Sequence, residues 1–164
     1  MSNAIRILGI DPGLHLTGYG AIESRGGDWA ILEAGVIQTD PRLPMPQRLE
    51  RLHQDLCGLL AEIKPDLAAI EQLYSHYAHP RTAILMGHAR GAILLACAQA
   101  GVEIRNMPAT MVKRSLTGNG HASKQQVQRA IQSFCRLPAP PEPPDVADAL
   151  AIALCAARKF PPRA

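Results

Sequence analysis

The stretch "IRILGIDPGLHLTGYG", Ile5 to Gly20, decides how this chain is interpreted. A mainly apolar run predicts a buried strand, and it ends on a single acid, Asp11, followed by Pro12 and Gly13. Asp-Pro-Gly favours a turn, because proline fixes φ at the second position and glycine accepts a positive φ at the third. A turn alone is enough to explain the tripeptide. A functional role for Asp11 therefore depends on what the rest of the chain brings to the same place.

Composition predicts a single globular domain that spans residues 1–164. Of the 164 residues, 47% are hydrophobic and 19% charged, which excludes a disordered or fibrous chain. The net charge of +3 and the pI near 8.8 are too weakly basic to establish an anionic partner. The four cysteines form no C-x-x-C pair, which is typical of reduced cysteines in a cytoplasmic protein. The longest apolar stretch, Gly91–Val102, is too short to cross a bilayer, so no membrane partner is expected.

Hydrophobic periodicity and turn signals predict an α/β chain. Three consecutive strands with short connections are expected to form an antiparallel meander, and later strands alternate with helices. This order predicts a mixed sheet with helices on its faces. The predicted strands are Ile5–Ile10, Gly18–Glu23, Trp29–Ile37, Asp66–Gln72 and Val102–Met107, and the predicted helices are Gln47–Ile63, Arg81–Ala100, a helix capped by Ser123 that ends at Phe134, and Asp145–Lys159.

Acids lie at strand ends and at a helix start within apolar sequence. Asp11 ends the first strand and Glu71 lies near the end of the fourth, while Asp145 and Asp148 share one face of the last helix. An isolated carboxylate in apolar surroundings is costly unless a cation compensates it. Oxygen ligands suit Mg²⁺ or Mn²⁺, and two such ions can promote phosphodiester hydrolysis. Each acid taken singly also has an ordinary explanation, as a solvated strand end or an acidic first turn.

Five blocks of the chain resemble, in order and spacing, the RuvC-type Holliday junction resolvases. The resemblance runs from about Ile5 to Ala157, and the blocks are "GIDPGLHLTGYG", "AIEQLY", "GHARGAI", "VKRSLTGNGHASKQQV" and "PDVADALAIAL". It implies an RNase H-like fold with a mixed five-stranded sheet and helices on both faces. It also implies Mg²⁺-dependent cleavage of two opposed strands of four-way junction DNA, with Mn²⁺ as a substitute and two ions per site. The catalytic and metal-binding residues carried over are Asp11, Glu71, Asp145 and Asp148.

The resemblance also implies DNA contacts and protein partners. Tyr74 matches the family's stacking aromatic, although the loop "QLYSHYAHP" is one residue longer than usual and makes Tyr77 a second candidate. Lys113 and Lys124 match phosphate-binding positions, and both flank the Gly-containing loop "TGNGHAS". The alternatives are surface tyrosines and solvated lysines. The expected partners are a second copy of the chain and the RuvA–RuvB branch-migration complex.

The helix Arg81–Ala100 is the predicted dimer interface, through the face that carries Gly87 and Gly91. The alternative is that these glycines pack on the sheet within one subunit.

Two rival functions remain open at this point. A junction-binding protein of the same fold that has lost its chemistry would explain the same blocks, although all four acids are intact. An actin-like phosphotransferase shares the "GIDPG" opening, but it needs a second phosphate-binding half in a chain about twice as long.

Overall fold

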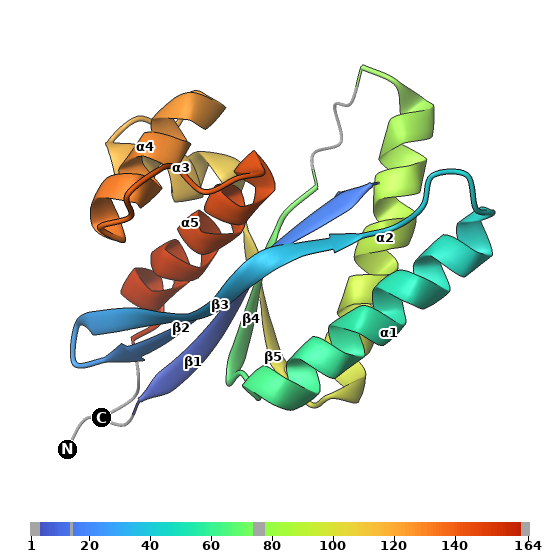
Figure 1. The fold of residues 1–164 in the computed structure, drawn as a ribbon, viewed down its shortest axis with the longest axis horizontal. Helices are drawn as coiled ribbons and strands as arrows, with labels where there is room; N and C mark the ends of the chain where they lie inside the picture. Colours follow the sequence, from blue (N-terminus) through green and yellow to red (C-terminus); the bar gives the residue numbers. More distant parts are fainter. Residues whose placement is uncertain (1–3, 14, 74–77, 162–164) are drawn as a thin grey trace.

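The computed structural model describes residues 4–13, 15–73 and 78–161. In these residues five strands form one mixed sheet in the spatial order β3-β2-β1-β4-β5 (Figure 1). The first three strands pair antiparallel as the predicted meander, and the last two run parallel to β1. The strands are β1 (Ile5–Asp11), β2 (Leu16–Arg25), β3 (Asp28–Gln38), β4 (Leu67–Glu71) and β5 (Glu103–Met107).

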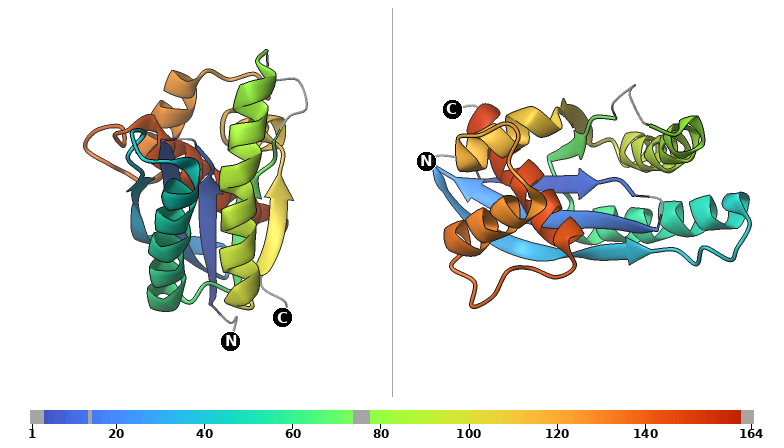
Figure 2. Two further views of the ribbon diagram at one scale, coloured as in Figure 1. Left: turned by 90° about the vertical axis from the view of Figure 1, so that its right-hand side faces the viewer. Right: turned by 90° about the horizontal axis from the view of Figure 1, so that it is seen from above.

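Helices cover both faces of the sheet, as predicted (Figures 1 and 2). Helices α1 (Met45–Ile63) and α2 (Pro80–Gln99) lie on one face. Helix α5 (Pro144–Lys159) lies on the other, with α3 (Ala109–Thr117) and α4 (Lys124–Phe134) packed against it. The predicted cap of α4 is confirmed: the Ser123 hydroxyl accepts from the Gln126 amide at 3.2 Å, and the Ser123 amide donates to Gln126 Oε1 at 2.8 Å.

The alternation of side chains along β1 produces two hydrophobic cores, one on each face. Leu8 and Ile10 point toward α1 and α2, whereas Ile7 points toward α5. Helix α5 is buried along almost its whole length between residues 146 and 156. A helix buried to this extent must lie very close to the sheet, and the strands beneath it carry glycine at the contact points.

Helix α2 turns the glycines of its predicted interface outward. A Cβ added at Gly87 or at Gly91 would meet no atom within 4 Å. The alternative that these glycines pack on the sheet within one subunit is therefore wrong. In the described part of the chain, no helix is both long enough and apolar enough to span a membrane.

Candidate active site

Three of the four predicted acids meet at the carboxyl ends of β1 and β4. Asp11 is the last residue of β1, Glu71 is the last residue of β4, and Asp148 lies in the first turns of α5. All three line a cavity of about 130 Å³ whose wall also includes Lys113 and Lys124. Residues from five separate elements of the chain thus converge on one small polar cavity.

The turn after Asp11 fixes where strand β1 ends. Pro12 has no N–H to donate, and the parallel pairing of β1 with β4 stops at Ile10 and Ile70. The positive φ predicted for Gly13 is wrong, because its backbone lies outside the left-handed region. Crowding is what requires glycine here: a Cβ at Gly13 would overlap the carbonyl oxygen of Leu16. The turn is thus too tight for any side chain at this position.

Glycines of β1 and β2 bring helix α5 close to Asp11. Asp11 pairs with Gly18 across the β1–β2 ladder, and a Cβ at Gly18 would overlap the carbonyl oxygen of Asp145. A Cβ at Gly9 would overlap the carbonyl oxygen of Ala149 in the same way. The backbone of α5 therefore rests directly on the sheet, and its first turns are held beside the end of β1. The run "TGYG" after the turn serves this close approach.

Burial and mutual repulsion raise the pKa values of two carboxylates of the cavity. Burial, the charge of Glu71 and a hydrogen bond between the two side chains together raise the pKa of Asp11 to about 9, and burial contributes most. Burial also raises the pKa of Asp148 to about 6, against the opposing effect of Lys124. The Lys124 ammonium nitrogen lies 3.9 Å from Asp148 Oδ2. At neutral pH the carboxyl groups of the cavity therefore cannot all be ionised unless a cation compensates their charge.

This donor set fits a hard divalent cation. Every acidic ligand is a carboxylate oxygen, the class that Mg²⁺ and Mn²⁺ prefer. Burial and neighbouring acids raise the pKa of Asp11, and a bound cation would oppose both effects because it favours the ionised form. In the described residues, no group of three His, Cys, Asp or Glu side chains already stands in metal-binding geometry.

The other predicted residues divide into three groups. Asp145 lies at the rim: it is absent from the cavity wall, but its charge raises the pKa of both Asp11 and Asp148. Lys113 is half-buried on α3 and Lys124 is exposed at the first position of α4, so both reach the cavity from one side. Tyr74 and Tyr77 lie outside the described residues. The role of Gly18 was not predicted, because its contact with α5 joins distant parts of the chain.

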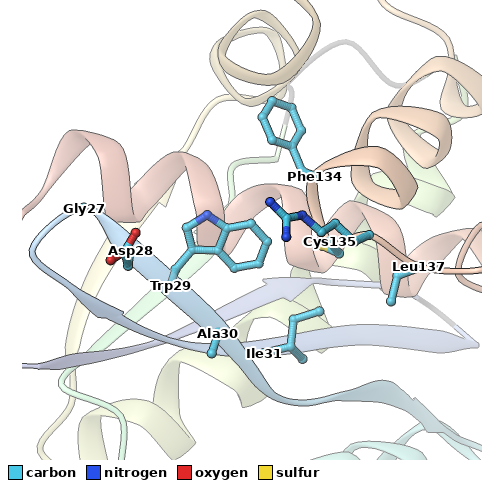
Figure 3. Close-up of a pocket in the computed structure, with 9 residues that line it drawn as sticks. Gly27, Asp28, Trp29, Ala30, Ile31, Phe134, Cys135 and Leu137 are labelled. Carbon is cyan, nitrogen blue, oxygen red and sulfur yellow. The ribbon is translucent and has the colours of Figure 1, made fainter.

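A larger hollow lies at the other end of the sheet. It has a volume of about 640 Å³ and lies between the β2–β3 turn and the end of α4. Figure 3 shows Trp29 and Ile31 on its β3 side, and Cys135 and Leu137 opposite them. Asp28 is the one acid among its lining residues, so it offers no comparable set of ligands.

Comparison with known proteins identifies relatives of the whole fold. The sequence model of the family described as "Crossover junction endodeoxyribonuclease RuvC" matches residues 7–156. The crossover junction endodeoxyribonuclease RuvC of Rhodopirellula baltica is 52% identical over 149 residues, which cover 91% of this chain and 84% of the relative. The protein of the same name from Caldicellulosiruptor saccharolyticus is 43% identical over 152 residues, covering 92% of this chain and 91% of that protein.

Solved structures agree with the sequence relatives. The structure "T. thermophilus RuvC in complex with Holliday junction substrate" superposes with a TM-score of 0.86 at 34% identity, covering 93% of each chain. The yeast mitochondrial Holliday junction resolvase Ydc2 superposes with a TM-score of 0.66 at 14% identity, covering 93% of this chain and 77% of its own, a likeness of fold alone. The predicted RNase H-like architecture is confirmed.

Proposed function

The chain belongs to the RuvC family of crossover junction endodeoxyribonucleases, and from this membership we propose that it resolves four-way (Holliday) DNA junctions in recombination and repair. The reaction is hydrolysis of one phosphodiester bond in each of two opposed strands. The observation that carries the proposal is the convergence of Asp11, Glu71 and Asp148 with two lysines on one cavity. A phosphodiester nuclease needs this combination, because acids hold the metal while cations hold the flanking phosphates.

The proposed metal ligands are the four acids, with Asp145 approaching from the rim. Mg²⁺ is the proposed ion, Mn²⁺ a substitute, and two ions per site the proposed number. Bound metal supplies Lewis acidity to the attacking water and to the leaving oxygen. The chain's own contribution is to hold Asp11 and Glu71 on neighbouring rigid strands and to place Asp148 opposite them on α5. Lys113 and Lys124 then bind the DNA backbone next to the scissile phosphate.

We propose a homodimer, since two opposed strands require two active sites related by a two-fold axis. Helix α2 supplies the candidate interface, on the face with Gly87 and Gly91. Ile84 and Leu95 lie on the same face, and they are 61% and 52% exposed. Large apolar side chains beside open glycines favour close contact with a second helix. The RuvA–RuvB branch-migration complex is the proposed further partner, and the cytoplasm the proposed location.

Tyr74 is the proposed stacking residue at the junction centre. Its ring would stack on an unpaired base, which is worth about 1–3 kcal/mol. Tyr74→Ala should therefore lose activity on intact junctions, while Tyr74→Phe keeps the ring and should stay near wild type. Tyr77→Ala, measured beside them, decides which tyrosine of the longer loop stacks. Equal activity of Tyr74→Ala and wild type would assign the role elsewhere.

The decisive experiment uses a synthetic four-way junction with each strand labelled in turn. Incubation with Mg²⁺ should give paired nicks in two opposed strands, whereas a linear duplex of the same sequence should stay intact. A protein that binds the junction tightly and leaves it uncut in both Mg²⁺ and Mn²⁺ would instead be a non-catalytic binding protein. Binding to neither DNA would refute the proposal altogether.

A further inference from the structure

The side chain of Arg90, in the middle of α2, contacts the main chain at the end of β4. Its Nε lies 3.4 Å from the main-chain carbonyl oxygen of Glu71, to which it donates. A terminal nitrogen of the same guanidinium donates to the side-chain oxygen of Asn106 on β5. The arginine thus joins one helix and two strands at the residue that bears a proposed metal ligand.

The main chain near Glu71 is hydrogen-bonded to β5 on one side, whereas its pairing with β1 on the other side has ended. On the β5 side the ladder continues past it, because the Gln72 amide donates to the Met107 carbonyl at 3.0 Å. On the β1 side the pairing has ended at Ile10 and Ile70, and Pro12 offers no N–H to extend it. The donor that reaches the Glu71 carbonyl comes from Arg90 on the helix.

The chemistry of arginine suits this position. A guanidinium is planar and presents several N–H donors in fixed directions, so it can serve two acceptors on different strands at once. It donates to the main chain of Glu71, which leaves the Glu71 carboxylate free to face the cavity on the other side of the strand. Asn106 accepts a hydrogen bond from a terminal nitrogen of Arg90 and so fixes the orientation of the guanidinium.

We propose that Arg90 is a positioning residue, which holds the backbone at Glu71 beside the end of β1 so that the carboxylates of Glu71 and Asp11 can bind the same ion. This inference rests on the proposed metal site and goes beyond it, since Arg90 is not itself a ligand. Partners of this kind, one step removed from the metal, commonly change metal affinity by about 10- to 100-fold when they are removed.

The test measures Mn²⁺ binding by calorimetry without DNA, together with thermal unfolding. Arg90→Met keeps the length of the apolar stem and removes the donors, and it should weaken Mn²⁺ binding roughly tenfold or more. Arg90→Lys should not restore binding, because an ammonium lacks the fork. The matched control is Arg51→Met on α1, whose guanidinium pairs with Asp55 at a surface site and should leave Mn²⁺ affinity unchanged.

A second pair of variants covers the case in which Arg90→Met does not fold. Asn106 is exposed, so Asn106→Ala leaves the core intact, frees the far end of the arginine and should weaken Mn²⁺ binding in the same direction. Asn106→Asp keeps an acceptor oxygen and should restore it. Wild-type Mn²⁺ affinity in Asn106→Ala and in any folded Arg90→Met, or full rescue by Arg90→Lys, would overturn the inference.

Failure of the inference and failure of the proposed function give different results. If wild type binds Mn²⁺ and cuts the junction while Arg90→Met and Asn106→Ala bind Mn²⁺ equally well, only the role of Arg90 falls. If wild type binds Mn²⁺ but cuts no junction, and Arg90→Met no longer binds Mn²⁺, the role of Arg90 stands and the nuclease assignment falls. A wild-type protein that binds no Mn²⁺ overturns both the site and the role.

Discussion

Two hollows of this protein differ in size and in chemistry, and the smaller one is the proposed active site. The hollow at the β2–β3 turn measures about 640 Å³ and has Asp28 and Arg136 as its charged lining residues. The cavity at the ends of β1 and β4 measures about 130 Å³, yet three carboxylates and two lysines line it. A DNA junction cannot enter either space, and a nuclease needs to admit only one phosphate with its metal. The proposal of the smaller cavity as the active site therefore rests on convergent charge and not on volume.

The largest effect should come from removing a carboxylate from the small cavity. Asp11→Asn, Glu71→Gln or Asp148→Asn should each lower junction cleavage on the order of a thousandfold or more, because metal-held charge stabilises the transition state. Junction binding, measured by gel shift, should persist, since the variants remove negative charge. Asp28→Asn in the large hollow is the matched control and should cleave normally. Cleavage near the wild-type rate would remove the substituted acid from the site.

The next effect tests whether the small cavity depends on the close approach of α5. Gly18→Ala places a Cβ against the carbonyl of Asp145 and must push the start of α5 away from Asp11. A displacement of about 1 Å in a catalytic group can cost about a hundredfold in rate. We expect a loss of that order in cleavage, with the circular dichroism of a folded protein.

The control for that variant is a glycine in open space. Gly58 lies on α1, and an added Cβ there meets no atom within 4 Å. Gly58→Ala should cleave normally and gain about 0.5–1 kcal/mol in the free energy of unfolding from helix propensity. If both variants cleave alike, the contact between Gly18 and α5 does not set the site.

A third effect concerns pH and the stability of the metal-free protein. The native Asp11 carboxyl keeps its proton up to about pH 9, whereas the unfolded chain releases it near the ordinary pKa of 3.8. Between these values the unfolded state binds fewer protons than the native state, so stability falls as pH rises. Asp148 acts in the same direction up to about pH 6. In EDTA, the melting temperature should therefore fall from about pH 5 to pH 9.

Asp11→Asn isolates this contribution from every other titrating group. The amide cannot ionise, so the variant should be more stable than wild type at about pH 8 in EDTA, and the difference should shrink toward about pH 4. Mg²⁺ should raise the melting temperature of wild type and have little effect on the variant. Parallel pH profiles of wild type and Asp11→Asn would show that the Asp11 carboxyl is ionised at neutral pH.

Sequence reasoning predicted the parts of the site whose signals are local. Strand alternation located β1 and β4, their terminal acids followed directly, and the Ser123–Gln126 spacing predicted the cap of α4. Contacts between distant elements leave no such pattern. That Gly18 lies under Asp145, and that Arg90 reaches Glu71, depends on how helices dock on the sheet. The reason given for glycine at residue 13 was wrong, because crowding against Leu16 within the same turn, and not a positive φ, requires it.

The smallest effect distinguishes the lysines of the small cavity from a cation of the large hollow. Lys113→Ala and Lys124→Ala should each reduce the slope of log affinity against log salt for junction binding by about one, which corresponds to one phosphate contact. Arg136→Ala, in the large hollow, should leave that slope unchanged.

Lys124→Ala should have a second effect, because Lys124 lowers the pKa of the neighbouring Asp148. Without the lysine that pKa rises, so the acidic limb of the cleavage profile should move to higher pH. Lys113 also lowers the Asp148 pKa, but it follows Lys124 in strength, so the shift in Lys113→Ala should be smaller. Unchanged salt slopes in both lysine variants would make these residues ordinary surface charges, and a slope that falls equally in Arg136→Ala would mean that the DNA contact extends to both ends of the sheet.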